Sequence, residues 1–513
     1  SWYGALAGYR GSHFSASVGQ FPKGNVILLA QSESALASTL GLAGSNGVDA
    51  QVAVCDNPSD RYGKVLALVA SSSGNLVRLA QFVARNRFVE DSDRLSISAE
   101  RLADPPPSSL APSWPETSQP LRLTRDLSGN LLHAKIGYPT SLYFRIAPDL
   151  DYGTKITVPL RLAFRLSGLS GDDHIWIAIR LNNTFVAKRR LSSADCLNSQ
   201  TQSYPIPVSL LYASNTLNVE INTDRSDTTV SDPAGVDLQI LPATDLDLEN
   251  PVHYVRMPRL DLFAAAGYPF TSKIDGSETA VLLPEYPSAA QVGLFLGAMG
   301  FLSAQTGVGA VNFEVLNAKN LAADQDRNFL VLGSSNDEST FRRFERGMVV
   351  IPADGNFELS ERPLPWQEWF SRAWLGRKEE RQSLLALLER DGGPKFLIEQ
   401  FASPFRADRS VVLLATRSEA DDQPYFDRLS EASRGGFVSG GLTVAADSGF
   451  RSFQLSSSSY ALGRLASLTG VYGWLRFHLW ILPLLLLGAA MVLAGWWERL
   501  LERQVELRLQ AIE

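Results

Sequence analysis

The chain has 513 residues, which at roughly 150 residues per domain predicts three or four domains. Hydrophobic residues make up 45% and charged residues 20%, a balance typical of packed domains and not of disordered chains. The formal net charge of −7 gives no overall attraction to phosphate, so nucleic acid is excluded as an expected partner. The two cysteines, Cys55 and Cys196, make neither a disulfide framework nor a metal-ligand pattern. They either form one bridge in an oxidising compartment or remain two buried free thiols.

Residues 1–103 carry the pattern of an α/β domain. Three continuous apolar runs are expected to form strands buried on both faces: residues 25–30, 51–55 and 64–70. Helical patterns follow the first run at 32–42 and the third run from the Ser/Gly/Asn loop 71–75 to about residue 85. No secretory leader is recognised before this domain, which opens at Ser1.

The middle of the chain changes character. Residues 104–119 are rich in proline and serine and predict a linker. From 120 to 245, period-two alternation replaces helical patterns, as in residues 175–180 (IWIAIR) and 216–221 (TLNVEI). This pattern predicts a β-sandwich or jelly roll, which is the architecture of many carbohydrate-binding modules.

Residues 246–458 repeat the element order of the first domain. Strands are expected at 278–283, 311–316, 328–333, 396–400 and 411–415. A helix is expected at 288–300, and a Ser/Asn loop at 334–337 follows a strand as the loop at 71–75 does. The repeat predicts two related α/β domains of the flavodoxin-like class.

The C-terminal part predicts a single membrane anchor. Residues 479–497 (LWILPLLLLGAAMVLAGWW) contain no charge, and at ~1.5 Å per residue they nearly cover a ~30 Å hydrocarbon core. Pro483 and Gly488 lie within this run, and tryptophans flank it as interfacial anchors do: Trp474, Trp480, Trp496 and Trp497. The alternative is a buried core helix. The prediction places the chain in the bacterial inner membrane, in contact with the lipid bilayer.

Charged residues on either side of the uncharged run 479–497 predict its orientation in the membrane. The tail 498–513 holds three arginines, against two in the preceding stretch, so a weak positive-inside bias favours a cytoplasmic tail and a periplasmic bulk. Residues 459–478 are expected to lie at the interface. A second candidate interface helix carries aromatic residues at i, i+3, i+4 and i+8: Trp366, Trp369, Phe370 and Trp374. Packing of this helix on its own domain is an equal alternative.

The sequence offers no catalytic constellation. The glycine-rich segment 41–47 ends a helix instead of opening one, no Walker A sequence occurs, and the five histidines are scattered. We therefore expect no enzyme activity, no cofactor and no metal. The loops 71–75 and 334–337 could hold a phosphate on backbone N–H groups, although such loops are usually simple turns. A glycoside hydrolase would need two carboxylates at a fixed separation, and no pair stands out.

Aromatic residues of the β domain are candidates for stacking on sugar rings. These candidate glucan contacts are Tyr138, Tyr143, Tyr152 and Trp176. Trp176 lies between Ile175 and Ile177 in an alternating strand, so core packing is the favoured alternative for it.

Several segments resemble one family, the periplasmic, membrane-anchored accessory subunits of bacterial cellulose synthase. Residues 260–271 (LDLFAAAGYPFT), 305–307 (QTG) and 329–334 (FLVLGS) are similar to the later α/β region of this family. Residues 56–65 (DNPSDRYGKV) resemble its first flavodoxin-like domain, and 179–186 (IRLNNTFV) resemble its carbohydrate-binding-like module. The family's usual LNG is LNN here, and Asn183 is expected to keep the turn because asparagine tolerates positive φ.

The resemblance implies a non-catalytic periplasmic scaffold. The family pattern is two modules, each a jelly roll followed by a flavodoxin-like domain, and this chain is expected to lack the first jelly roll. The implied partners are the catalytic subunit of cellulose synthase, whose activity the chain would support, and the β-1,4-glucan chain that it would guide. Some family members are said to bind cyclic di-GMP, but the resemblance assigns that site to the catalytic subunit. Homo-oligomer formation stays open, and a membrane-anchored carbohydrate-binding receptor is the alternative function.

Overall fold

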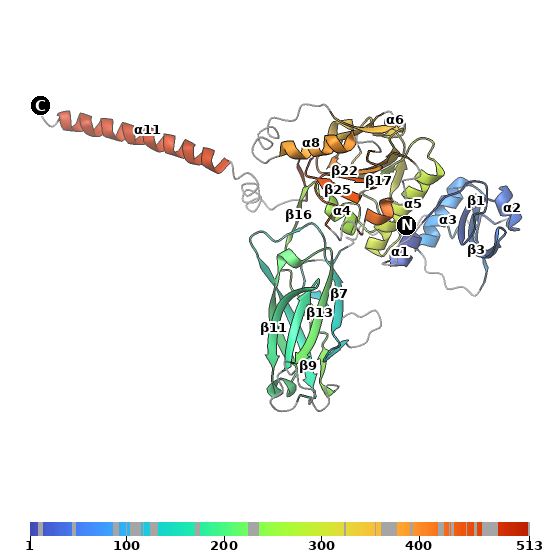
Figure 1. Ribbon diagram of the computed structural model, residues 1–513, viewed down its shortest axis with the longest axis horizontal. Helices are drawn as coiled ribbons and strands as arrows, with labels where there is room; N and C mark the ends of the chain where they lie inside the picture. Colours follow the sequence, from blue (N-terminus) through green and yellow to red (C-terminus); the bar gives the residue numbers. More distant parts are fainter. Residues whose placement is uncertain are drawn as a thin grey trace.

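The structure is a computed structural model, and it describes residues 1–8, 14–43, 48–85, 92–98, 100–102, 114–115, 117–123, 132–169, 175–223, 235–322, 325–353, 355–360, 377–389, 393–418, 425–429, 431, 436–447, 449–455, 459–463 and 481–510. Figure 1 shows an N-terminal unit (blue), a β-sandwich (green), a C-terminal unit (yellow to orange) and a long helix that extends away from them.

The N-terminal unit is a mixed sheet between short helices. Its elements are α1 (Trp2–Ala7), β1 (Val26–Gln31), α2 (Ala35–Thr39), β2 (Ala50–Asn57), β3 (Asp60–Ala70), α3 (Ser73–Arg85) and β4 (Arg94–Ile97). The strand order is β1-β3-β2-β4, and only the β1–β3 pair is parallel. Ala37 of α2 packs on one face of the sheet, and Leu79 and Val83 of α3 pack on the other.

The prediction of a flavodoxin-like fold is wrong for this unit. Only Pro58 and Ser59 separate β2 from β3, and a connection this short makes an antiparallel hairpin, whereas a parallel crossover needs about a dozen residues or more. Asn57 holds the hairpin in place, because its buried amide donates to the carbonyl oxygens of Pro22 and Gly24, both at 2.8 Å.

The sandwich consists of two antiparallel sheets packed face to face. Its elements are β5 (Leu121–Arg122), β6 (Leu132–Lys135), β7 (Thr140–Arg145), β9 (Thr157–Ser167), β10 (Ile175–Leu181), β11 (Thr184–Leu191), η2 (Ser193–Cys196), β12 (Gln200–Pro207), η3 (Val208–Leu210), β13 (Ser214–Thr223), β14 (Asp237–Ile240) and β15 (Asp245–Leu246). One sheet has the order β11-β10-β13-β7, and the other is β5-β15-β9-β14-β6 with β12 paired to β9. Alternate residues of both sheets, such as Ile177, Val219 and Phe164, form one core.

A tight turn joins β10 to β11. Asn182 and Asn183 have φ values of 50° and 64°, the left-handed pair that a two-residue hairpin turn requires. The prediction that Asn183 keeps this turn is confirmed. The Asn182 side chain also donates to the Leu210 carbonyl oxygen at 2.8 Å and accepts from the Thr216 backbone N–H at 2.9 Å, which fixes the turn against β13.

The C-terminal unit is built on a seven-stranded sheet. Its elements are β16 (Val252–Met257), α4 (Leu260–Ala266), β17 (Thr279–Leu282), α5 (Ala289–Thr306), β18 (Glu314–Leu316), β19 (Asn328–Ser334), α6 (Glu338–Phe341), η5 (Glu345–Gly347), β20 (Val350–Ala353), β21 (Asn356–Leu359), α8 (Arg377–Leu388), β22 (Phe396–Ala402), β23 (Ser410–Thr416), β24 (Leu442–Ala446), β25 (Gly449–Phe453) and β26 (Tyr460–Gly463). The order is β18-β17-β19-β23-β22-β24-β25.

The flavodoxin-like prediction is wrong for this unit as well. The first four strands of the order are parallel, but β22, β24 and β25 each run antiparallel to their neighbours. Strand β24 ends at Ala446 and β25 begins at Gly449, and a connection this short again makes an antiparallel hairpin. Strands therefore dominate the described residues, in several mixed and antiparallel sheets.

The last helix, α11 (Ile481–Gln510), extends away from the three units. Among the described residues, no helix is both long enough and apolar enough for a membrane crossing. This finding overturns the predicted transmembrane helix over 479–497 and the inner-membrane localisation and bilayer contact that rested on it. Residues 481–497 of the uncharged run form only the first part of α11, which continues through charged residues such as Glu498, Arg499 and Arg503.

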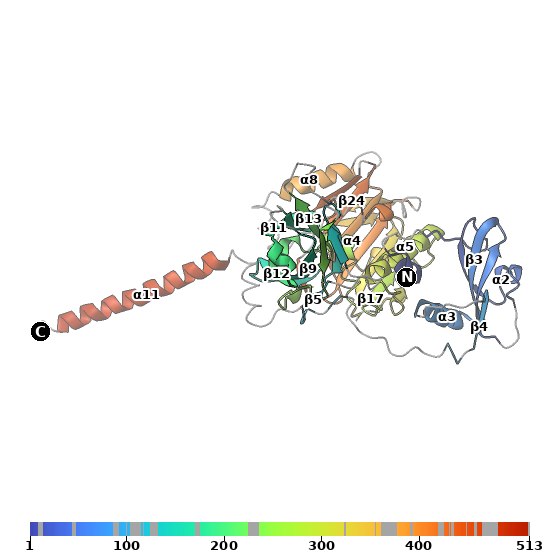
Figure 2. The same ribbon diagram turned by 90° about the horizontal axis from the view of Figure 1, so that it is seen from below.

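The units touch at two places. Helix α1 packs on α5, and Gly4 lies so close to Gly300 that a Cβ atom at Gly4 would be 2.1 Å from the Gly300 carbonyl oxygen. Both Figure 1 and Figure 2 show α5 on the side of the C-terminal unit that faces the N-terminal unit. Nearby, the Gln81 side chain donates to the Val311 carbonyl oxygen at 3.2 Å.

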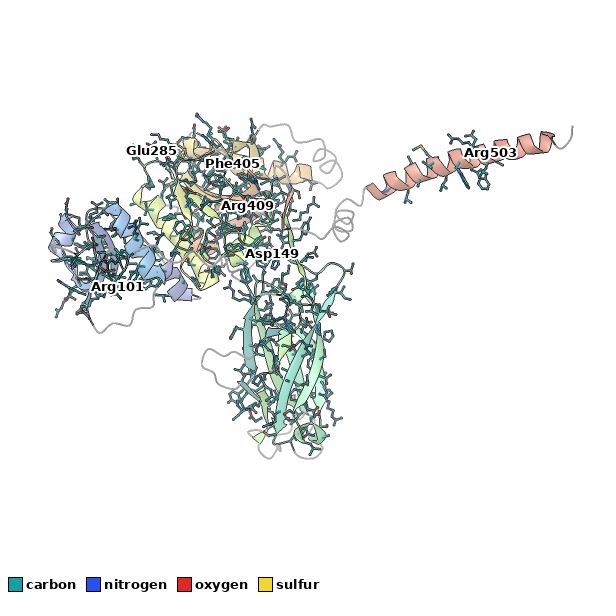
Figure 3. The ribbon with its side chains drawn as sticks, turned by 180° about the vertical axis from the view of Figure 1, so that it is seen from behind. Arg101, Asp149, Glu285, Phe405, Arg409 and Arg503 are labelled. Carbon is teal, nitrogen blue, oxygen red and sulfur yellow. The ribbon has the colours of Figure 1, made fainter. Side chains whose placement is uncertain are left out.

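The second contact joins the sandwich to the C-terminal unit. Strand β16 pairs with β8 (Leu150–Asp151), which follows β7, and with β26. Beside it, His253 Nδ1 lies 3.0 Å from Asp149 Oδ1, and the Tyr268 hydroxyl donates to Asp149 Oδ2 at 3.4 Å. Figure 3 shows Asp149 at this junction. The hydrogen bond to Asp149 raises the pKa of His253, so protonated His253 strengthens the contact.

Candidate functional site

The face of the β11-β10-β13-β7 sheet that points away from the sandwich core is the candidate site, and we call it the outer face. Inward residues of these strands, such as Leu142, Ile179 and Leu217, are buried in the core. Strand alternation therefore sends the residues between them outward. The outer face carries Ser141, Tyr143, Trp176, Arg180, Phe185, Lys188, Arg190, Asn218 and Glu220.

Three aromatic side chains lie on the outer face. Tyr143 of β7 is 77% exposed, and Phe185 of β11 is 50% exposed, whereas Trp176 of β10 is only partly exposed. Trp176 pairs with Asn222 and Tyr143 pairs with Thr216, six residues apart along β13. At ~3.4 Å per residue their backbone positions are offset by about 20 Å along the strand direction, on two strands separated by β13, with Phe185 at an intermediate level. The spacing suits an extended oligosaccharide better than a single sugar.

Polar side chains fill the centre of the outer face. The Ser141 hydroxyl donates to Asn218 Oδ1 at 2.7 Å, and Arg180 Nε lies 3.2 Å from Glu220 Oε1. Hydroxyl, amide, carboxylate and guanidinium groups are the donors and acceptors that sugar hydroxyls need. The arrangement of polar groups between aromatic rings is typical of sugar-binding surfaces, which combine stacking with hydrogen bonds.

The Trp176 end of the outer face is basic. Lys188 Nζ lies 4.5 Å from the centre of the Trp176 ring, a cation–π contact. Arg190 is the cross-strand partner of Trp176, and Lys188 is the partner of Ala178. One face of the Trp176 indole is therefore occupied by an ammonium group.

The structure brings together only two of the four predicted glucan contacts, Tyr143 and Trp176. Tyr138 is 75% exposed but lies in the turn before β7, and Tyr152 packs against the sandwich core. The Tyr152 hydroxyl is buried and has no hydrogen-bond partner among the residues that the structure describes, and burial raises the pKa of Tyr152 to about 12. No observation tests a sugar-binding role for any of the four, so that role stays a prediction.

Sequence reasoning missed Phe185 and Lys188. Both follow the Asn182–Asn183 turn, and a two-residue turn fixes the register of β11 on β10. The register alone does not show on which face of the sheet these two side chains lie. An irregularity between Ile179 and Arg180 shifts the alternation of side chains along β11 relative to β10.

The other predicted interface residues have mixed outcomes. Pro483, Gly488, Trp496 and Trp497 lie in α11, where both tryptophans are exposed. Trp474 and Trp480, and the aromatic set Trp366, Trp369, Phe370 and Trp374, lie outside the described residues. Cys55 and Cys196 are free thiols, but each is partly exposed and not fully buried as the second alternative expected.

The loop at 334–337 has no free place for a phosphate. Asp337 Oδ2 accepts hydrogen bonds from the Ser334 backbone N–H at 2.7 Å, from the Ser334 hydroxyl at 2.8 Å and from Gln291 Nε2 at 2.7 Å. The carboxylate thus occupies the donors that an anion would use. In the part of the chain that the structure describes, no group of three or more His, Cys, Asp or Glu residues is arranged to hold a metal.

Comparisons with known proteins give one consistent family. The domain model "Cellulose synthase BcsB, first FD domain" matches residues 1–97, "second CBM domain" matches 134–244, and "second FD domain" matches 253–414. The chain belongs to the cellulose synthase BcsB family. The outer face lies within the part of this BcsB chain that matches the carbohydrate-binding domain.

Longer relatives support the assignment. A protein of Xanthomonas axonopodis pv. citri (strain 306) is 27% identical over 96% of this chain and 66% of its own length. A protein of Pseudomonas fluorescens (strain SBW25) is 26% identical, over 81% of this chain and 58% of its own. One of Escherichia coli (strain K12) is 23% identical, over 97% and 65%. Each is named "Cyclic di-GMP-binding protein". The chain spans about two thirds or less of the length of each of these three relatives.

Proposed function

We propose that this chain is a non-catalytic accessory subunit of a cellulose synthase, which holds the β-1,4-glucan on its outer face and supports the catalytic subunit. The observation that carries the proposal is the set of exposed aromatic and polar groups on the outer face, within a module matched to a carbohydrate-binding domain. Stacking on Tyr143 and Phe185, with hydrogen bonds from Asn218, would hold an extended chain loosely enough for it to move on.

Glucan binding gives the first test. Tyr143→Ala removes an exposed ring that is worth roughly 0.5–1.5 kcal/mol in stacking, so the affinity of the chain for cellohexaose should fall about twofold to tenfold. Isothermal titration calorimetry measures the change. Tyr62→Ala is the matched control, because Tyr62 is 87% exposed on the N-terminal unit, away from the outer face. Equal affinities of the Tyr143 variant and the unaltered chain would remove Tyr143 from the site.

Helix α11 supports the second part of the proposal. Its exposed apolar residues, Leu486, Leu487, Met491, Val492, Leu493, Trp496 and Trp497, meet no other part of the described chain. A surface of this kind marks an interaction site. We assign it to the catalytic subunit, and the chain's support of glucan synthesis would depend on this docking.

Co-purification tests the docking. Replacing Trp496 and Trp497 together by glutamate should strongly reduce the amount of catalytic subunit recovered with the tagged chain from detergent extracts, because a charge in an apolar contact is costly. Arg503→Gln on the same helix is the control (Figure 3). Recovery of the catalytic subunit with the double variant at the control level would contradict the docking role. An independent carbohydrate-binding receptor, the alternative function, predicts glucan binding with no synthase recovered even with the unaltered chain.

The relatives' name raises cyclic di-GMP as a ligand, which would require donors for two phosphates. We propose no such site at the loop 334–337, because Asp337 already occupies donors of that loop.

A further inference from the structure

The basic end of the outer face has the composition of a binding site for a charged ligand. Lys188 and Arg190 are both exposed on β11, next to Trp176 of β10. The whole chain has a net charge of −7, so this cationic cluster lies on a protein that is acidic overall. A local excess of positive charge attracts anionic partners.

Neighbouring acids in the described part of the sandwich are already paired elsewhere. Glu220 is 3.2 Å from Arg180, and Asp195 lies on the inward side of β11, where its Oδ1 is 2.9 Å from Arg189 NH2. Among the described residues, no carboxylate lies within ion-pair distance of Lys188 or Arg190. Their charges are therefore available to a ligand.

The cation–π contact adds a second argument. A neutral sugar that stacks on the Trp176 face occupied by Lys188 must first displace the ammonium group, which costs the energy of that contact. A ligand that bears a carboxylate or an acid ester leaves Lys188 in place and pairs with it. The geometry at Trp176 thus favours an anionic substituent, whereas the opposite end, at Tyr143, offers an unobstructed ring.

We propose that Lys188 and Arg190 make the outer face selective for β-glucan chains that carry anionic substituents. This inference rests on the proposed glucan-binding function of the outer face and names the ligand class that the face prefers. The Tyr143 end contacts unsubstituted glucose units. At the Trp176 end, Lys188 and Arg190 pair with the anionic substituents.

Affinity electrophoresis of the full chain tests the selectivity. The gels contain hydroxyethyl cellulose, carboxymethyl cellulose or polygalacturonate, which separate the neutral backbone, the charged backbone and charge without the backbone. We expect both celluloses to retard the chain. The affinity for carboxymethyl cellulose should be roughly threefold to tenfold higher, because two exposed ion pairs contribute binding free energy of about that size. Salt should reduce this preference. Polygalacturonate should retard the chain less than carboxymethyl cellulose does.

The variant K188M/R190M should lose the preference and keep its affinity for hydroxyethyl cellulose. Lys135→Met, an exposed lysine on the other sheet, should keep the preference. Equal affinity of the unaltered chain for both celluloses would overturn the selectivity and leave the proposed function standing. Binding to neither cellulose would overturn both. A preference that survives in K188M/R190M, or equal retardation by polygalacturonate, would overturn the role of these two residues.

Discussion

Glu399→Gln should remove most of the dependence of stability on pH between about pH 4.5 and 8. Glu399 lies in β22, only 1% exposed, and its carboxylate accepts hydrogen bonds from the backbone N–H groups of Val349 at 2.5 Å and Val350 at 3.3 Å. Burial raises the pKa of Glu399 from 4.5 to about 8, and the two hydrogen bonds only partly oppose this rise.

The direction follows from proton binding. Within this pH window the folded chain keeps a proton on Glu399 that the unfolded chain releases, so the free energy of unfolding falls as the pH rises. Each unit of pKa shift corresponds to about 1.4 kcal/mol, so the loss across the window is on the order of 4 kcal/mol. Glutamine carries no charge at any pH. The variant should therefore match the unaltered chain near pH 5 and be more stable at pH 8.

Thermal unfolding followed at several pH values between 5 and 8.5 measures the effect. Glu358→Gln is the control, because Glu358 is an exposed carboxylate on β21 near the same strands. His253 also contributes stability that is lost as the pH rises through its raised pKa, and it should contribute equally in all three proteins. Parallel curves for Glu399→Gln and the unaltered chain would show that Glu399 is not the titrating group.

Gly4→Ala should separate α1 from α5. A Cβ atom at Gly4 would lie 2.4 Å from the Gly300 Cα and 2.1 Å from its carbonyl oxygen, and neither backbone atom can move without shifting α5. Overpacking of this kind costs roughly 1–3 kcal/mol, more than a six-residue helix can retain by its own propensity. The Gln81 contact to Val311 would remain, but one hydrogen bond contributes only about 1 kcal/mol.

Two measurements follow the separation. Amide exchange in α1 should become fast, and small-angle scattering should report a larger radius of gyration as the N-terminal unit moves away. Gly74→Ala is the control, because the nearest atom to its added Cβ is Ser72 Oγ at 4.0 Å. Unchanged exchange in α1 of the Gly4 variant would show that the helices tolerate the added methyl group.

Each strand segment that the sequence predicted is present in the structure, but the directions of the strands were not predicted. Alternation at 175–180 and 216–221 corresponds to β10 and β13, and the apolar runs at 64–70 and 328–333 correspond to β3 and β19. The flavodoxin-like prediction failed because an apolar run shows that a strand is buried and says nothing about its direction. Loop length carried the missing information: only Pro58 and Ser59 separate β2 from β3, and a connection this short excludes a parallel crossover.

Similar limits apply to the candidate site. Core packing was favoured for Trp176 because both its sequence neighbours are apolar, yet Trp176 faces outward together with Arg180, which lies four residues further along the strand. Tyr152 lies beside Gly153, a typical exposed-loop context, yet its hydroxyl is buried. The basic cluster forms only when the β10–β11 hairpin brings Lys188 and Arg190 beside Trp176, and no one-dimensional pattern contains that pairing.

Strand β16 has a mechanical consequence. Its first two residues pair with β8 and its last four with β26, so a single strand belongs to both the sandwich and the C-terminal unit. Under the proposed glucan-binding function, a polymer drawn along the outer face would apply a force to the sandwich and therefore a torque to β16. The backbone hydrogen bonds of β16 and the Asp149–His253 contact would both carry this torque. A flexible linker at the same place would bend instead. Under the same proposal, the two pairings of β16 would hold the sandwich in one orientation while the polymer moves.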